Sequence, residues 1–201
     1  MIIKNGILIE VENKDIPESG IIVIPDNVKA IAQYAFYNAT KLEEVIFSEH
    51  VCAVGEGAFW KCENLRRVQF SDEVLAIGGA AFDCCTKIEK IILPNKLKVI
   101  QNEAFYNCMS LKEVTFPENV IKIGAYAFCG CSSLEFVKAS KKLKEIGAYA
   151  FAKCRNLNNV DFSNTSLKKI TESSFYLCDS LRKISLPEDT LHQQVAAKRP
   201  C

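Results

Sequence analysis

Cysteine offers the most chemistry of any residue type in this chain, because its thiolate can bind metal, form disulfides or act as a nucleophile. The 201 residues contain 10 cysteines and only two histidines, His50 and His192. Each cysteine of one subset lies three residues after a phenylalanine; we call this subset the cysteine column: Cys62, Cys85, Cys108, Cys131, Cys154 and Cys178. Such a regular placement favours reduced packing in a core over a disulfide framework.

The spacing of the cysteines and histidines gives only weak support to a metal site or to a catalytic nucleophile. Cys84-Cys85 and Cys129-Gly130-Cys131 have the spacing of ligand pairs, but one member of each pair belongs to the cysteine column. A linear row of thiols does not converge on one point, as tetrahedral zinc requires. His50 and Cys52 could form a base and a nucleophile, yet no third group orients the histidine. We therefore expect no catalytic residue, no metal site and no cofactor, and a protein that is not an enzyme.

The cysteines take their spacing from a larger pattern of phenylalanines. Seven of these recur at intervals of 23 residues five times and then 24: Phe36, Phe59, Phe82, Phe105, Phe128, Phe151 and Phe175. We call them the phenylalanine column. A fixed period of this length indicates a solenoid, in which each repeat contacts only its neighbours and the stack presents one long surface.

One repeat contains both helical and strand periodicity. Apolar residues from Ile100 to Cys108 share the face of a helical turn, so we expect a short helix or 3₁₀ turn there. Val114 and Phe116 alternate with polar residues, which predicts a strand that Pro117 ends. The fold class is therefore an α/β solenoid of 23-residue repeats, with short helical turns and a parallel sheet on one face whose strands lie about 4.8 Å apart.

The ends of the chain depart from the repeat. Residues 1–20 predict a capping hairpin with a turn at Asn5-Gly6. Residues 21–189 contain a half repeat followed by about seven repeats. Residues 190–201 break the period, and the alternatives for them are a weak cap, a partner-binding tail or disorder.

Residues 111–133 read LKEVTFPENVIKIGAYAFCGCSS, and this string resembles the BspA-type leucine-rich repeat, a class first noted in treponemes. The resemblance covers residues 21–189. It implies a curved leucine-rich-repeat solenoid and, commonly, protein binding or adhesion at surfaces of bacteria and anaerobic protists. The family supplies no catalytic residues to carry over. The chain departs from the pattern at Ala39, which replaces the cysteine, at Ser174, which replaces the alanine, and in lacking a visible export signal.

Charge and hydropathy narrow the class of partner. Lys and Arg total 25 against 24 Asp and Glu, a net charge of +1. This balance lacks the excess of basic residues that is typical of proteins that bind nucleic acid or an anionic membrane. No apolar run approaches the length of a membrane span, and the first residues lack the apolar region of a signal peptide. We expect a cytoplasmic protein, with the cell surface as the alternative that the family implies.

Two sets of residues are candidates for binding a protein. The first lies on strand positions that face away from the core: Ile21, Val23, Ile46, Gln69, Ile92, Thr115 and Phe136. Exposed apolar residues on one face suggest an interface, although β-propensity alone also explains isoleucine and valine there. The second set follows the phenylalanine column by one residue and comprises Tyr37, Trp60 and Tyr106, which either bind a partner or pad the edge of the turns.

A further column reads Glu43, Arg66, Glu89, Lys112 and Glu135, and its alternating signs favour stabilisation of the register over a charged docking strip. The function that we expect is a non-catalytic protein–protein interaction module with an unknown protein partner. The alternatives are a surface adhesin for host matrix or carbohydrate, a structural homo-oligomer through the C-terminal end and, less favoured, an enzyme.

Overall fold

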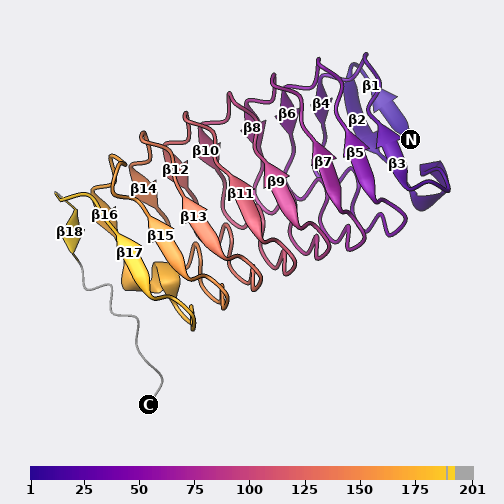
Figure 1. Cartoon of the computed structure of the whole chain (residues 1–201). Coiled ribbons are helices and arrows are strands. Elements are labelled where there is room, and N and C mark those ends of the chain that lie inside the picture. Colours follow the sequence, from indigo (N-terminus) through magenta and orange to yellow (C-terminus); the bar gives the residue numbers. More distant parts are fainter. Residues whose placement is uncertain (189, 193–201) are drawn as a thin grey trace.

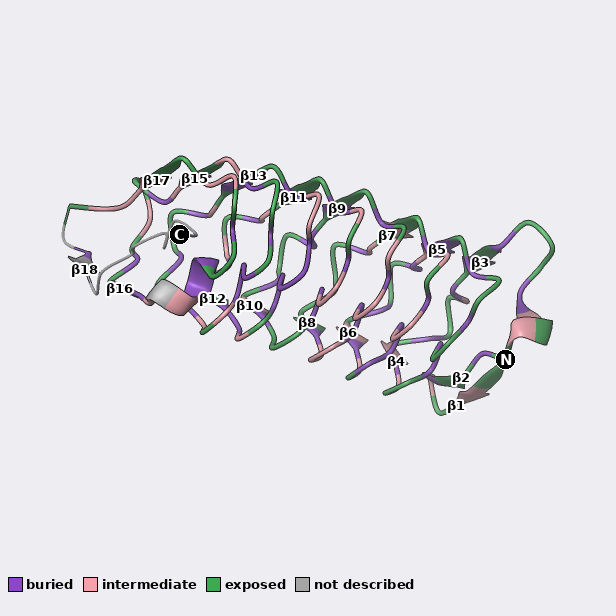
Figure 2. Ribbon diagram, turned by 90° about the horizontal axis from the view of Figure 1, so that it is seen from below, coloured by how far each residue is buried: buried purple, intermediate pink, exposed green. Residues whose placement is uncertain are grey.

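The computed structural model describes residues 1–188 and 190–192. The chain winds as a solenoid in which each repeat supplies one strand to each of two rows of parallel strands (Figure 1). The two rows lie on opposite sides of a buried interior (Figure 2). The expected solenoid, its parallel sheet and its period of 23 residues are therefore confirmed, and the second row is the extended return of each repeat.

The first row is built from three-residue strands whose outer two residues face solvent in most repeats. Its strands are β3 (Ile21–Val23), β5 (Glu44–Ile46), β7 (Arg67–Gln69), β9 (Lys90–Ile92), β11 (Glu113–Thr115), β13 (Phe136–Lys138), β15 (Asn159–Asp161) and β17 (Lys183–Ser185). Neighbouring strands pair in parallel, with Val45 opposite Val68 and Val137 opposite Val160. The ladder falls into three pieces, β3-β5-β7, β9-β11 and β13-β15-β17.

The second row contains two-residue strands. Its hydrogen-bonded ladder is interrupted between β8 and β10, which divides the row into two pieces. Its strands are β4 (Ala30–Ile31), β6 (Ala53–Val54), β8 (Ala76–Ile77), β10 (Val99–Ile100), β12 (Lys122–Ile123), β14 (Glu145–Ile146), β16 (Lys169–Ile170) and β18 (Leu191–His192). Their aliphatic residues, such as Ile31 and Ile123, are buried against the core. Strand pairing thus joins neighbouring repeats on both sides of the interior, except where the rows break: between β7 and β9, between β11 and β13, and between β8 and β10.

The N-terminal residues form an antiparallel hairpin of β1 (Ile2–Lys4) and β2 (Ile7–Glu10), followed by the 3₁₀ helix η1 (Asn13–Asp15). Strand β2 pairs in parallel with β4, so the hairpin covers the N-terminal edge of the second row. At the other end β18 pairs with β16 and continues the same row. For residues 190–201 the alternatives were a weak cap, a partner-binding tail or disorder. Most of this segment, residues 193–201, lies outside the described residues.

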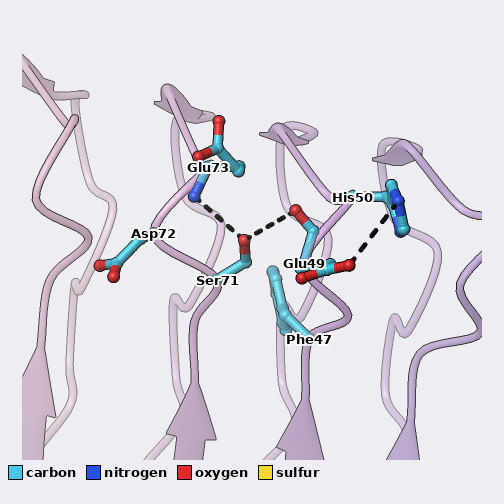
Figure 3. Close-up of a pocket in the computed structure, with 6 residues that line it drawn as sticks. All are labelled: Phe47, Glu49, His50, Ser71, Asp72 and Glu73. Atoms are coloured by element: carbon cyan, nitrogen blue, oxygen red, sulfur yellow. Dashed lines mark hydrogen bonds and ion pairs between the residues drawn. The ribbon is translucent and has the colours of Figure 1, made fainter.

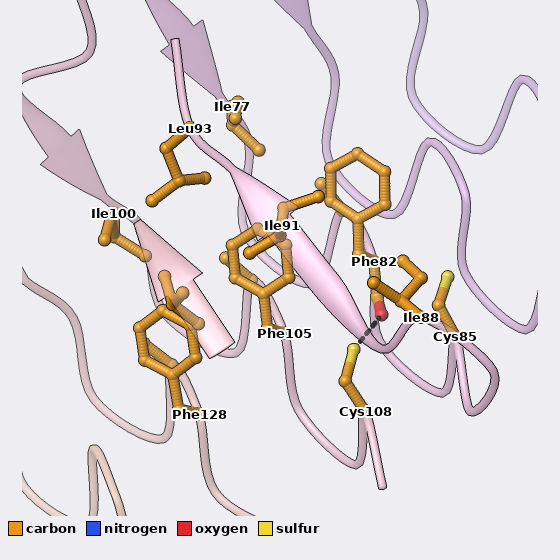
Figure 4. Packing of buried hydrophobic residues seen from close by; sticks show 14 of the residues in the cluster. Ile77, Phe82, Cys85, Ile88, Ile91, Leu93, Ile100, Phe105, Cys108 and Phe128 are labelled. Atoms are coloured by element: carbon orange, nitrogen blue, oxygen red, sulfur yellow. Dashed lines mark hydrogen bonds between the residues drawn. The ribbon is translucent and has the colours of Figure 1, made fainter. Parts of the chain in front are cut away.

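The phenylalanine column stacks through the middle of the solenoid (Figure 4). Consecutive ring centroids lie 4.7 Å apart at Phe36–Phe59 and 5.6 Å apart at Phe151–Phe175. Five of the six neighbouring pairs lie within 7° of parallel. The amides of the first six phenylalanines also donate to a carbonyl in the next repeat, as from Phe105 N to Ala127 O at 2.8 Å. The turns are therefore linked by a third ladder of hydrogen bonds in addition to the two sheets.

The expected helical turns around each phenylalanine are turns with i→i+3 hydrogen bonds rather than α-helices. The residues two before and two after the phenylalanine have left-handed backbone, for example Tyr126 at φ 57° and Lys153 at φ 60°. A left-handed residue interrupts any right-handed helix. Only the last repeat, where the spacing is 24, contains a regular 3₁₀ helix, η2 (Glu172–Phe175). Within the described residues the helical part of the fold is confined to η1 and η2.

Glycine precedes the turn in four repeats because the backbone of the preceding repeat passes too close for a side chain. A Cβ atom on Gly147 would lie 2.4 Å from the backbone nitrogen of Ala125, and one on Gly78 would lie 2.5 Å from that of Glu56. Both are below any ordinary contact distance, so a side chain at either glycine would displace the backbone of the preceding repeat.

We predict that Phe105→Ala in the middle of the column lowers the free energy of unfolding by about 3–5 kcal/mol, because the cavity loses two stacked neighbours. Lys112→Ala on the solvent face is the control and should leave the unfolding curve nearly unchanged. Denaturant melts of the two variants measure the difference. Similar losses from both would show that the column does not anchor the fold.

Candidate functional site

The cysteine column forms a row of hydrogen-bond donors inside the core. The Cys108 thiol donates to the carbonyl of Phe82 at 3.2 Å, and Cys62 donates to that of Phe36 at 3.0 Å (Figure 4). All six thiols of the column make this bond to the phenylalanine of the preceding repeat. Each of these carbonyls already accepts from the backbone amide three residues on, so the thiol supplies a second donor to a buried carbonyl.

This role accounts for the departure at Ala39. The first repeat has no preceding phenylalanine carbonyl to accept a thiol, and alanine fills the same buried position. Sequence reasoning placed the column in the core but missed the hydrogen bond. The missing cysteine in the first repeat was the signal that could have shown it.

Burial also removes the thiols of the column from nucleophilic chemistry. Desolvation raises the pKa of Cys62 and of Cys178 to about 12, and it also raises the pKa of Cys85, Cys108 and Cys131 well above the ordinary value of a thiol. Thiolate is the reactive form of cysteine, so these groups stay protonated at neutral pH. All nine cysteines among the described residues are unpaired thiols.

His50 lines an open hollow of about 530 Å³ together with Phe47, Glu49, Ser71, Asp72 and Glu73, and Cys52 is not part of the lining (Figure 3). His50 Nε2 lies 4.0 Å from Glu49 Oε1, and the Ser71 hydroxyl donates to the Glu49 backbone carbonyl at 3.3 Å. The Cys52 thiol donates elsewhere, to the carbonyl of Lys29 at 3.3 Å. The described contacts therefore pair neither Ser71 nor Cys52 with the imidazole.

Within residues 1–188 and 190–192 no group of three or more His, Cys, Asp or Glu side chains is arranged to hold a metal ion. Over the same residues no helix is long and apolar enough to cross a bilayer.

The outer face of the first row carries the first candidate set. Val23 and Ile92 are 62% and 61% exposed, and Ile21, Gln69, Thr115 and Phe136 are exposed as well. Ile46 is only half-buried, between Val23 and Gln69 in register. The structure brings Ile21, Val23, Ile46 and Gln69 together on the β3-β5-β7 piece. Ile92 lies on the separate β9-β11 piece of the ladder, which its position within the repeat could not reveal.

A buried carboxylate borders the apolar residues of this face, and the sequence analysis missed it. Glu44 is 6% exposed and accepts hydrogen bonds from Arg67 at 2.7 Å and from the Gln69 amide at 2.6 Å. The bonds from Arg67 and then from Gln69 hold the pKa of Glu44 below its usual value. The network fixes the Arg67 and Gln69 side chains, which gives the N-terminal half of the face a rigid polar border.

The gap in the ladder between β11 and β13 opens a second hollow, of about 730 Å³. Thr115 and Phe136 line it from neighbouring strands, so the structure brings these two candidates together. Charged residues of both signs surround them: Lys112, Glu113, Glu118, Glu135, Lys138 and Lys141. The mixture suits a polar protein segment better than a small apolar ligand.

The alternating charges do pair across repeats, at the surface. Lys112 Nζ lies 2.9 Å from Glu89 Oε2, and Arg66 lies 3.8 Å from Glu43. The bond from Lys112 is the main reason that the pKa of Glu89 falls below its usual value. These pairs are consistent with register stabilisation, although exposed ion pairs contribute little to stability.

The second candidate set lies along the turns. The rings of Tyr37 and Trp60 are 5.1 Å apart, and Tyr34, which sequence reasoning missed, lies 6.1 Å from Trp60. Tyr106 belongs to the same column but is separated from Trp60 by Asp83. The structure therefore gathers two of the three candidates with Tyr34 and leaves Tyr106 apart.

The comparisons with known proteins agree with this architecture. A model of the BspA-type leucine-rich-repeat region matches residues 18–131 and 98–196, in six copies. The chain therefore belongs to the BspA-type leucine-rich-repeat family. No protein among the curated sequences matches the chain.

Solved structures of repeat proteins resemble the chain as well. The leucine-rich-repeat protein of T. pallidum is 27% identical, with a TM-score of 0.63 over 90% of this chain and 75% of that one. A leucine-rich-repeat protein from Bacteroides ovatus is 21% identical, with a TM-score of 0.42 over 85% of this chain and 73% of that one. Proteins of this family are generally protein-binding or surface-associated, and the fold is typically a non-catalytic scaffold.

We predict that the native protein exposes few reactive thiols. Cys52 is exposed and should react rapidly with a thiol reagent at neutral pH, whereas the cysteine column should react only after unfolding. Titration under non-reducing conditions should count ten thiols in denaturant, and Cys52→Ser should remove the fast reaction of Cys52 in the native protein. Rapid native reaction of the whole column, or a denatured count near zero, would contradict the packing described above.

Proposed function

We propose that this chain is a non-catalytic module that binds a partner protein on the outer face of the first row, toward the N-terminal half. The observation that supports this is the exposure of Val23 and Ile92 above 60% on a sheet whose inward residues already form the core. Side chains that support no core are free to contact a partner. Parallel pairing places Val23 beside Ile46 on one piece of the row, and Ile92 beside Thr115 on the next piece.

The composition of the face fits a protein partner. Val23, Ile46 and Ile21 supply an apolar patch, and the Arg67–Glu44–Gln69 network lies beside it with its hydrogen bonds already formed. Protein interfaces typically combine an apolar centre with a polar rim. Because the rim is held in place before binding, less side-chain entropy is lost when a partner docks.

We propose the cytoplasm as the location of the protein, and the free thiols of the described residues support a reducing compartment. The family also contains surface-associated proteins, so the adhesin remains the second candidate. Fractionation of the source cells distinguishes the two, since an adhesin would be recovered with the envelope.

We predict that Val23→Asp combined with Ile92→Asp abolishes capture of the partner from a lysate of the source cells and leaves the melting curve almost unchanged. Two charges would then lie where a partner must bury apolar surface. Leu75→Asp is the matched control, because Leu75 is 56% exposed and lies outside the first row. The proposal fails if the double variant captures the same proteins as the Leu75 variant does.

A further inference from the structure

Three aromatic rings gather at the edge of the solenoid formed by the first turns. Tyr34 and Tyr37 flank the indole of Trp60, which is the only tryptophan of the chain. Tyr34 is 45% exposed and Tyr37 is 47% exposed, so the cluster opens to solvent. The face of an indole ring is the best aromatic surface for a cation.

The position of Tyr34 depends on a glycine in the next repeat. Gly57 occupies the position that holds tyrosine in two later repeats, Tyr126 and Tyr149. A Cβ atom on Gly57 would lie 2.4 Å from the ring of Tyr34. The missing side chain therefore lets the Tyr34 ring lie over this turn, next to Trp60.

An incompletely paired carboxylate lies beside the rings. Asp83 follows Trp60 by one repeat in the same column and is half-buried. Its Oδ1 is enclosed and has no hydrogen-bond partner among the described residues. Burial raises the pKa of Asp83, while Cys84, the Lys61 charge and Trp60 oppose that shift. Buried carboxylate oxygens are ordinarily paired, so this side chain has charge left to satisfy.

A cation of the protein itself already lies on the indole. Lys61 Nζ is 5.2 Å from the centroid of the Trp60 ring. Among the ion pairs of the described residues, none joins Lys61 or another base to Asp83. A cation therefore already lies on the indole, while Asp83 has no cationic partner among the described ion pairs.

We propose that Tyr37, Trp60 and Asp83 form a site for one arginine side chain of a protein partner. A guanidinium is flat, so it can stack on the indole while its edge faces the carboxylate, and it is weakly hydrated. The partly buried setting of Asp83 strengthens the attraction relative to water. The inference rests on the proposed function in that the ligand belongs to a protein, but the site is on the turns rather than on the sheet.

The test is a titration of the purified full chain with a capped Gly-Gly-Arg-Gly-Gly peptide, followed by tryptophan fluorescence. Trp60 is the only indole, so the signal reports this site alone. The same peptide with citrulline in place of arginine keeps the shape and lacks the charge. We expect a saturable change with arginine and binding at least about tenfold weaker with citrulline.

Two variants should move the affinity in opposite directions. Asp83→Asn removes the charge and should weaken binding about tenfold. Lys61→Met keeps the apolar stem and removes the internal competitor, so binding should tighten. Lys153→Met at the same position of a later repeat and Asp72→Asn elsewhere on the surface are the matched controls and should leave the affinity unchanged.

The proposal is overturned by a response that does not saturate, by equal responses to arginine and citrulline, or by an unchanged affinity in Asp83→Asn. Equal responses would indicate a simple apolar contact. Circular dichroism melts establish that each variant is folded. The Val23→Asp and Ile92→Asp variant should keep the peptide response, so failure of the arginine site and failure of the sheet surface are distinguishable.

Discussion

The stack of phenylalanine rings is the interaction on which the rest of the structure depends. Ring centroids about one strand spacing apart, such as the 5.3 Å between Phe82 and Phe105, require successive turns to superimpose almost without rotation. That superposition brings equivalent backbone groups opposite each other in both rows of strands. It also aligns each cysteine thiol with the phenylalanine carbonyl of the preceding repeat, as at Cys108 and Phe82. One column therefore sets the register of the hydrogen-bond ladders that surround it.

This constraint separates residues that support the fold from residues that are free for binding. Inward positions such as Ile91 are buried in repeat after repeat, and a change there affects two neighbours. Outward positions such as Ile92 contact neither the core nor the turns, so they vary between repeats from isoleucine to glutamine, lysine and aspartate. Variation along the outer face gives each part of a regular solenoid its own chemistry. The apolar patch beside Glu44 and the aromatic cluster at Trp60 are two results of that variation.

The sequence predicted the features that repeat, since periodicity reports which residues face inward. It could not give the left-handed turns, because tyrosine, glutamate and lysine carry no sign of a positive φ. Gly57 and Gly130, with Asn38 and Asn107, were the hints in those columns. The gaps in the first row fall between strands whose residue types do not differ in kind from those of the paired strands. The Trp60 cluster depends on departures from the pattern, Gly57 and Asp83, whose meaning appears only when neighbouring turns are superimposed.

Nearest-neighbour coupling through the phenylalanine column is the central claim, and hydrogen–deuterium exchange of Phe105→Ala against the unchanged protein tests it most directly. The amides of Phe82 and Phe128 donate to the next turn, at 2.8 Å each, so their protection reports the coupling on both sides of the substitution. The account predicts that protection falls most at these two amides and least at the distant Phe36 amide. An equal loss in every turn, or a loss confined to the turn of residue 105, would contradict it.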